Sequence, residues 1–161
     1  MKIIFLDIDG VLNNFSSYTN KTTVVWESDC VERLNKIVEK TGAKIVISST
    51  WRFSRRHIDA YTNDMGIKGE IIDKTPRSTF FSACRGDEIL EWINEHKEVE
   101  KFVILDDDSD MGDLFKYLIQ INPEFGLTDS DVEKVIARFN DTQESDFWRT
   151  DGCRPSRPCS C

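Results

Sequence analysis

The chain has 161 residues, and its 21 basic and 29 acidic side chains give a formal net charge of −8. This length suits one domain with a substantial core, and the acidic balance argues against a protein that coats nucleic acid without specificity. No apolar run approaches a membrane span, and the N-terminal apolar run is too short and too acidic for a signal peptide. We therefore expect a cytoplasmic protein without a membrane partner.

The first element along the chain is an apolar strand, residues 2–6, that runs directly into Asp7, Asp9 and Gly10. Alternate residues of a strand share a face, so both acids would start on one side, and the glycine permits a tight turn just after them. Carboxylates at the end of a buried strand are costly unless a cation or donors neutralise them. A hard cation bound by oxygen, Mg²⁺ first, is therefore expected here.

Strands and helices alternate through the rest of the chain. Polar, β-prone residues 13–27 suit a small flap, and a helix is expected to begin at a cap on Ser28 or Asp29 and to stop at Gly42. Further helices are predicted near residues 54–64, over 87–96 and after a cap at Thr128, and further strands over 44–47, 70–72, 102–105 and 117–121. This alternation predicts a three-layer α/β sandwich around a mainly parallel, five-stranded, Rossmann-like sheet.

The predicted domain covers residues 1–141, and residues 142–161 read as a weakly structured tail. Cys30 and Cys84 lie in periodic segments and are expected to be buried thiols. Three more cysteines occupy the tail, where zinc binding is an alternative to a flexible or appended segment. Little chain is left over for a large cap domain, so the site should be open, as suits a macromolecular end or a general small phosphoester.

Polar side chains follow three of the predicted strands: Asp7 and Asp9, residues 48–50, and residues 106–108. In a parallel sheet these strand ends meet. A carboxylate beside Mg²⁺ can attack phosphorus, and a second acid can protonate the leaving oxygen and then deprotonate water. A hydroxyl can hold phosphate oxygens while a cation neutralises developing charge. The pattern is thus typical of metal-assisted phosphoryl transfer.

The order and spacing of these groups resemble the haloacid dehalogenase (HAD) superfamily of Mg²⁺-dependent phosphohydrolases over roughly residues 1–140. Its first motif is similar to Leu-Asp-Ile-Asp-Gly-Val here, which implies Asp7 as nucleophile and Asp9 as general acid/base, with both at the metal. Its second is similar to Ile-Val-Ile-Ser, which implies Ser48 as a phosphate-binding hydroxyl. The resemblance therefore implies a nucleophile, an acid/base and a phosphate-binding hydroxyl at the ends of two predicted strands.

The fourth motif of the superfamily resembles Ile-Leu-Asp-Asp, which ends at Asp107. The resemblance implies Asp107 as the metal ligand with Asp106 second, and Asp110 as a residue that orients a water or the loop. The third motif usually carries lysine. Arg85 occupies that position and keeps the charge, with a planar fork suited to phosphate, while Lys74 is its competitor.

A narrower resemblance connects the chain with the phosphatase domains of Swiss Army Knife RNA-repair proteins. It is carried by Ser-Ser-Thr-Trp-Arg at residues 48–52, by Thr-Pro at 75–76 and by Arg-Gly-Asp-Glu-Ile at 85–89. This resemblance, rather than the composition, implies polynucleotide ends or nucleotides as substrates. The expected substrate-binding residues are Ser48, Ser49, Arg52 and Arg85.

A local basic cluster, Arg52, Arg55, Arg56 and His57, follows the serines directly. It is either a solvated face or a ledge that contacts substrate phosphates, with Arg52 as the best single candidate. The tryptophans at 26 and 51 are similarly open to two interpretations, stacking on a base or packing.

Together these features predict a Mg²⁺-dependent phosphomonoester hydrolase that forms an aspartyl phosphate, acting on nucleic-acid or nucleotide phosphate ends. A small-metabolite phosphatase is one alternative. A receiver-like phospho-acceptor without turnover and a quiet nucleic-acid-binding module are the others, and the sequence indicates no particular protein partner.

Overall fold

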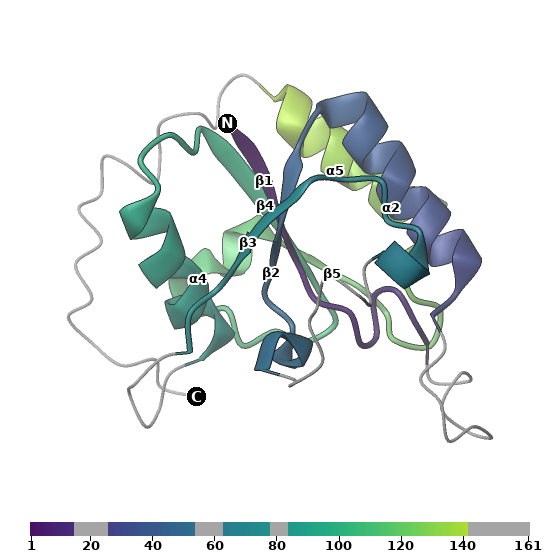
Figure 1. Ribbon diagram of the computed structural model, residues 1–161, viewed down its shortest axis with the longest axis horizontal. Coiled ribbons are helices and arrows are strands. Elements are labelled where there is room, and N and C mark those ends of the chain that lie inside the picture. The colour runs from purple at the N-terminus through teal and green to yellow at the C-terminus, as the bar shows by residue number, and fades with distance from the viewer. Residues whose placement is uncertain (15–25, 54–62, 78–83, 142–161) are drawn as a thin grey trace.

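The fold is built on one sheet of five strands, all of them parallel, in the order β3-β2-β1-β4-β5 (Figure 1). It is a computed structural model that describes residues 1–14, 26–53, 63–77 and 84–141. The strands are β1 (Lys2–Leu6), β2 (Lys44–Ile47), β3 (Ile71–Lys74), β4 (Lys101–Asp106) and β5 (Leu118–Gln120). The α/β, Rossmann-like architecture expected from the sequence is confirmed.

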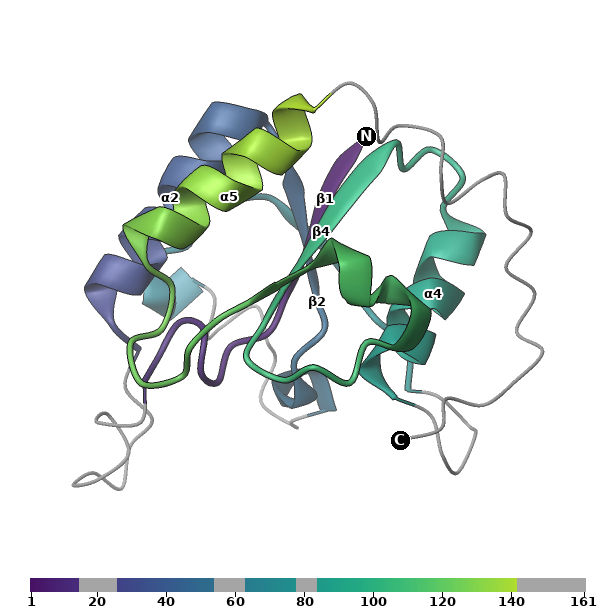
Figure 2. The ribbon, with the colours of Figure 1, turned by 180° about the vertical axis from the view of Figure 1, so that it is seen from behind.

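Helices cover both faces of the sheet and make three layers. Helices α2 (Ser28–Thr41) and α5 (Asp129–Asn140) lie side by side on one face, and α4 (Arg85–Glu95) lies on the other, as Figures 1 and 2 show. Successive side chains of β1 enter different cores: Ile4 and Leu6 pack beneath α2 and α5, while Phe5 packs with α4. Both faces of β1 are buried, and this explains why its sequence is apolar without alternation.

Most element boundaries agree with the sequence, and the deviations have local causes. Helix α2 is preceded by Glu27 in extended conformation, so the predicted cap at Ser28 or Asp29 is wrong. Its end at Gly42 is confirmed, with φ 65° in the left-handed region that glycine tolerates. The cap at Thr128 is also confirmed, since its side chain accepts a hydrogen bond from the Asp131 backbone N–H.

The region between β4 and β5 differs from expectation, because the 3₁₀ helix η2 (Gly112–Tyr117) shortens β5. A second 3₁₀ helix, η1 (Thr50–Phe53), follows β2. The tail, most of the expected flap and most of the helix near 54–64 lie outside the described residues. Cys30 and Cys84 are buried cysteines, as expected. Within the described ranges, none of the helices has the length and apolar character needed to cross a membrane.

Candidate active site at the carboxyl ends of the strands

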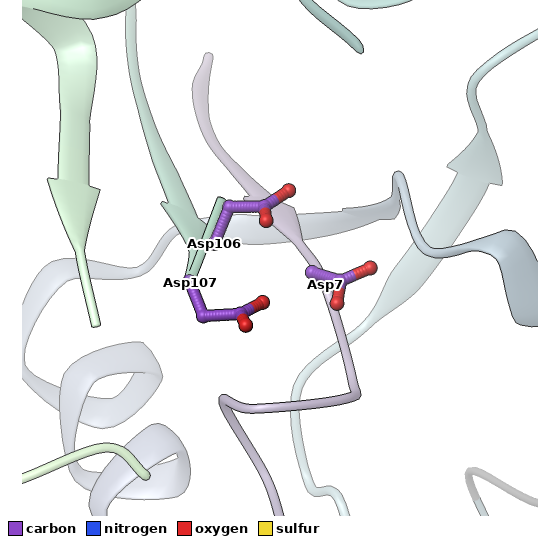
Figure 3. A group of neighbouring side chains, drawn as sticks. All are labelled: Asp7, Asp106 and Asp107. Carbon is purple, nitrogen blue, oxygen red and sulfur yellow. The ribbon is translucent and has the colours of Figure 1, made fainter. Parts of the chain in front are cut away.

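Three carboxylates meet where β1 and β4 end (Figure 3). Asp7 follows the last residue of β1, Asp106 is the last residue of β4, and Asp107 comes next. The parallel register pairs Leu6 with Leu105, and the Asp7 backbone N–H donates to the Leu105 carbonyl at 2.9 Å. One oxygen from each carboxylate lies within 4.8 Å of the other two. The strand pairing thus assembles the acidic cluster, which we define as Asp7, Asp106 and Asp107.

The acidic cluster is electrostatically costly when no cation is present. Burial, with smaller contributions from Asp9 and Asp107, raises the pKa of Asp7 from 3.8 to about 6, against the lowering effect of Arg85 and of a hydrogen bond from Ser49. Burial and the charge of Asp7 raise the pKa of Asp106 to about 7. Burial also raises the pKa of Asp107. These groups resist losing their protons unless positive charge is supplied.

The donor set of this cluster fits a hard divalent cation. Its three side chains offer only carboxylate oxygen, the ligand that Mg²⁺ prefers. The Asp106 Oδ2 atom is buried and has no hydrogen-bond partner among the described residues, with the Arg85 Nε at 4.0 Å. An orphaned buried oxygen beside two further carboxylates is chemically suited to a cation.

Asp9 is held apart from the acidic cluster. Its Oδ2 accepts a hydrogen bond from the Trp51 indole Nε1–H at 2.8 Å, and its Oδ1 accepts one from the Asn13 Nδ2 at 3.0 Å. The described group of potential metal ligands contains Asp7, Asp106 and Asp107, without Asp9. Asp9, which the resemblance also places at the metal, is thus not in this group: β1 ends at Leu6, so strand alternation no longer keeps Asp9 beside Asp7.

Among the described residues, Arg85 is the cation that forms ion pairs with the acidic cluster. Its Nη1 lies 3.5 Å from Asp7 Oδ1, and its side chain is only 15% exposed. The buried Nη1 has no hydrogen-bond partner within the described ranges, so a donor hydrogen remains for an anion. Lys74, the competitor, is exposed on β3 and makes no ion pair with the cluster in the described part of the chain. Of the two candidates for the third-motif cation, Arg85 is thus the one that lies near the cluster.

The position of Arg85 depends on contacts between α4 and the loop after β4. The Arg85 backbone N–H donates to the Asp110 carboxylate at 3.1 Å, and the Gly86 N–H donates to the Asp110 carbonyl at 3.2 Å. A Cβ on Gly86 would lie 2.0 Å from the Met111 carbonyl oxygen, so only glycine permits this approach. Asp110 thus orients the loop and the start of α4, one of the two roles expected for it.

The two serines at the end of β2 have different surroundings. The Ser49 hydroxyl is close enough to Asp7 to lower the pKa of that carboxyl, and its Oγ accepts a hydrogen bond from the Trp51 backbone N–H at 3.3 Å. Ser48 is fully buried, and its Oγ has no partner among the residues described. The second-motif resemblance selected Ser48, but Ser49 is the serine in contact with Asp7. Both serines follow the same short strand, and the fold decides which hydroxyl acts on Asp7.

Arg52 is not the exposed ledge residue that was expected. Its side chain is 1% exposed and forms an ion pair with Glu88 of α4. It also donates to the carbonyls of Ser48 and Ser49 at the end of β2, and Nε donates to the Thr75 carbonyl at 3.0 Å. These contacts engage the guanidinium, so Arg52 is buried and does not lie on the solvated face or ledge that the charge pattern predicts. The other members of the basic cluster lie outside the described residues.

A surface aromatic next to Arg52 is not among the residues that the sequence singles out. Phe53, at the end of η1, is 45% exposed, with the guanidinium carbons of Arg52 and Arg77 at 4.0 Å and 5.3 Å from its ring centre. Trp26 and Trp51, the aromatics expected to stack or pack, are half-buried against the core under α2 and α5. The position of Phe53, immediately after the serine and arginine motif, was the available signal.

A parallel α/β sheet with acids at the ends of β1 and β4, and with a serine and an arginine beside them, defines a HAD-type protein. The match to known families is specific: residues 3–132 match the family described as the HAD domain in Swiss Army Knife RNA repair proteins. This match spans most of the chain, and the protein belongs to that family. A comparison with curated proteins found no match. Family membership supports a phosphatase-like function in general terms.

Proposed function

We propose that the protein is a Mg²⁺-dependent phosphomonoester hydrolase that works through a phosphorylated Asp7. The observation that carries the proposal is the placement of Asp7 between a candidate cation site and Arg85. One of its oxygens lies within 4.8 Å of an Asp106 oxygen and an Asp107 oxygen, a donor set that fits a cation, and its Oδ1 lies 3.5 Å from the Arg85 Nη1. A carboxylate so placed can approach a dianionic phosphate whose charge is neutralised on both sides.

In the first step the Asp7 carboxylate oxygen forms a bond to phosphorus as the ester P–O bond breaks. Asp9 gives its proton to the departing oxygen. In the second step Asp9, now a carboxylate, takes a proton from water while the water oxygen attacks phosphorus. The bond between Asp7 and phosphorus breaks, and inorganic phosphate leaves. Asp9 returns to its protonated form, so the cycle is balanced.

The remaining residues bind and neutralise the phosphate. Arg85 offers donors to its oxygens, and Ser48 and Ser49 offer hydroxyls. Asp7 and Asp107, supported by Asp106, would hold Mg²⁺, which when bound supplies positive charge against the phosphoryl oxygens. The raised pKa values of Asp7 and Asp106 favour this assignment, since a cation stabilises the carboxylates that burial disfavours.

We further propose polynucleotide phosphate ends as the substrate class. Two observations support it: the family is described by its occurrence in RNA repair proteins, and Phe53 presents an exposed ring beside Arg77. Aromatic rings bind bases without strong sequence preference, and an arginine next to one can pair with a backbone phosphate. A small metabolite would gain little from such a surface.

The test is phosphate release with and without Mg²⁺ from oligonucleotides bearing 3′- or 5′-phosphates and from nucleotides and small phosphoesters. We expect Mg²⁺-dependent turnover, a preference for one oligonucleotide end, and loss of turnover in Asp7→Asn with the fold retained. Preference for small esters would reassign the substrate to metabolites. Stoichiometric phosphorylation without turnover would identify a phospho-acceptor, and an active Asp7→Asn variant would refute the nucleophile assignment.

A further inference from the structure

The Asp9 carboxylate is held by two side-chain donors from different parts of the chain. The Trp51 Nε1–H, from η1, donates to Oδ2 at 2.8 Å, and the Asn13 Nδ2 donates to Oδ1 at 3.0 Å. Both oxygens are thereby engaged, one from each side. A carboxylate attached through a rotatable bond loses its freedom to turn when each of its oxygens has a fixed donor.

Both donors are themselves fixed. The Asn13 Oδ1 accepts the Gly10 backbone N–H at 2.8 Å, which leaves the amide nitrogen of Asn13 directed toward Asp9. Asn13 is 1% exposed, so this geometry is protected from water. Trp51 belongs to η1, its backbone N–H donates to Ser49 Oγ, and its ring packs against the core. An indole N–H can only donate, so its direction defines where the Asp9 oxygen must lie.

We propose that Trp51 and Asn13 are positioning residues that hold Asp9 in the orientation from which it transfers its proton to the leaving oxygen. The inference rests on the proposed function, in which Asp9 is the acid and base. Trp51 connects the ends of two neighbouring strands: it lies in η1, which follows β2, and it donates to Asp9 in the loop that follows β1. The Trp-Arg pair at 51 and 52 thus has two separate tasks: Trp51 orients Asp9, and Arg52 ties η1 to α4.

The proposal predicts a dependence on the leaving group. An alkoxide leaving group, such as the ribose oxygen of an oligonucleotide end, needs a proton as the P–O bond breaks, whereas a nitrophenolate needs little help. Trp51→Phe keeps an aromatic ring, although a smaller one, but removes the N–H donor. We expect kcat/KM to fall by about tenfold to a hundredfold for the alkyl ester and by less than about threefold for para-nitrophenyl phosphate, because a misoriented acid loses part of the roughly 10²–10⁴-fold that general acid catalysis contributes.

Trp92→Phe is the matched control. The Trp92 indole N–H also donates to a carboxylate, that of Asp73 at 2.7 Å, but on the α4 face of the sheet. Its loss should change kcat/KM for both ester classes in the same proportion. Asn13→Asp is the second variant, because it keeps an oxygen for Gly10 and places a carboxylate where Asp9 had a donor. It should show the same selective loss on the alkyl ester.

The outcomes distinguish a failure of the proposed hydrolase function from a failure of the positioning role of Trp51 and Asn13. A wild-type protein that hydrolyses neither ester class overturns the proposed function and this inference with it. A wild-type protein active on both, with Trp51→Phe reducing kcat/KM equally for alkyl and nitrophenyl esters, overturns the positioning role alone. Thermal unfolding of each variant shows whether a shared loss comes from instability. A selective loss in Trp51→Phe and Asn13→Asp, absent in Trp92→Phe, supports the inference.

Discussion

Gly10 and Asp107 lie so close that the site has no room for a side chain at position 10. A Cβ there would stand 2.5 Å from the Asp107 Cγ and 2.7 Å from its Oδ2, and Gly10 has φ 73°. The first and fourth motifs are therefore in contact through the Gly10 backbone and the Asp107 side chain. The glycine that follows the two aspartates serves the turn and also leaves space for the carboxylate of the neighbouring strand.

Replacing Gly10 with alanine should reduce Mg²⁺ affinity as well as stability, because the new methyl group displaces Asp107. Gly42→Ala is the control: Gly42 has φ 65° and nothing within 4 Å of its Cβ position. Both variants should lose about 1 kcal/mol for the left-handed conformation. Titration calorimetry with Mg²⁺ should show weaker binding in Gly10→Ala only. Equal affinity in the two variants would contradict the close contact.

Asp107→Asn should weaken Mg²⁺ binding by at least about tenfold. Removing a residue that only hydrogen-bonds a metal ligand already costs about that much, and here a ligand itself is changed. Asp113→Asn, an exposed acid of η2, removes the same charge away from the cluster. The measurement is the Mg²⁺ concentration that gives half-maximal thermal stabilisation. If both variants shift it equally, net charge rather than ligation is responsible.

Stabilisation by Mg²⁺ should increase with pH between about 5 and about 8. The folded-state pKa values of Asp7 and Asp106, about 6 and about 7, lie above the ordinary 3.8. Without metal, the folded state therefore binds more protons than the unfolded state across this window, and its stability falls as pH rises through it. Mg²⁺ competes with those protons. Melting temperatures with and without Mg²⁺ test this, and a difference that shrinks toward high pH would contradict it.

Arg52→Met should lower the free energy of unfolding by about 3 kcal/mol, as expected when one partner of a buried ion pair is removed. The change removes the Arg52 charge from Glu88, which is 15% exposed, and removes the donors to the carbonyls at the end of β2. Arg77→Met, at an exposed position, should change stability by less than about 0.5 kcal/mol. Denaturant unfolding distinguishes them. A stable Arg52→Met variant with an increased KM would restore the ledge hypothesis.

Phe53→Ala should raise KM for oligonucleotide ends by about 5-fold to 150-fold, which corresponds to the loss of about 1–3 kcal/mol of base stacking. KM for a small phosphoester should not change, because such a substrate has no base. Phe115→Ala removes another exposed ring, 55% exposed, from η2. Steady-state kinetics of both variants on both substrates compare the KM values, and we expect only Phe53→Ala on the oligonucleotide to show an increase. An unchanged oligonucleotide KM in Phe53→Ala would exclude a stacking role.

The sequence predicts the features that depend on neighbouring residues and on regular periodicity. The apolar strands, the glycine end of α2 and the threonine cap of α5 follow from local chemistry, and the alternation of elements implies a parallel sheet. The meeting of Asp7 with Asp106 and Asp107 was expected because parallel strands end at one side. The family followed from the same motifs.

Contacts between segments distant along the chain were decided by the tertiary structure. Asp9 faces Trp51 rather than the acidic cluster, because β1 ends before it and η1 brings an indole donor to it. Arg52 is buried, because Glu88 and the strand-end carbonyls surround a position that the charge pattern placed on the surface. Local sequence sets backbone preference and periodicity. The partner of a polar side chain depends on which segments pack together, and that is fixed only in the folded chain.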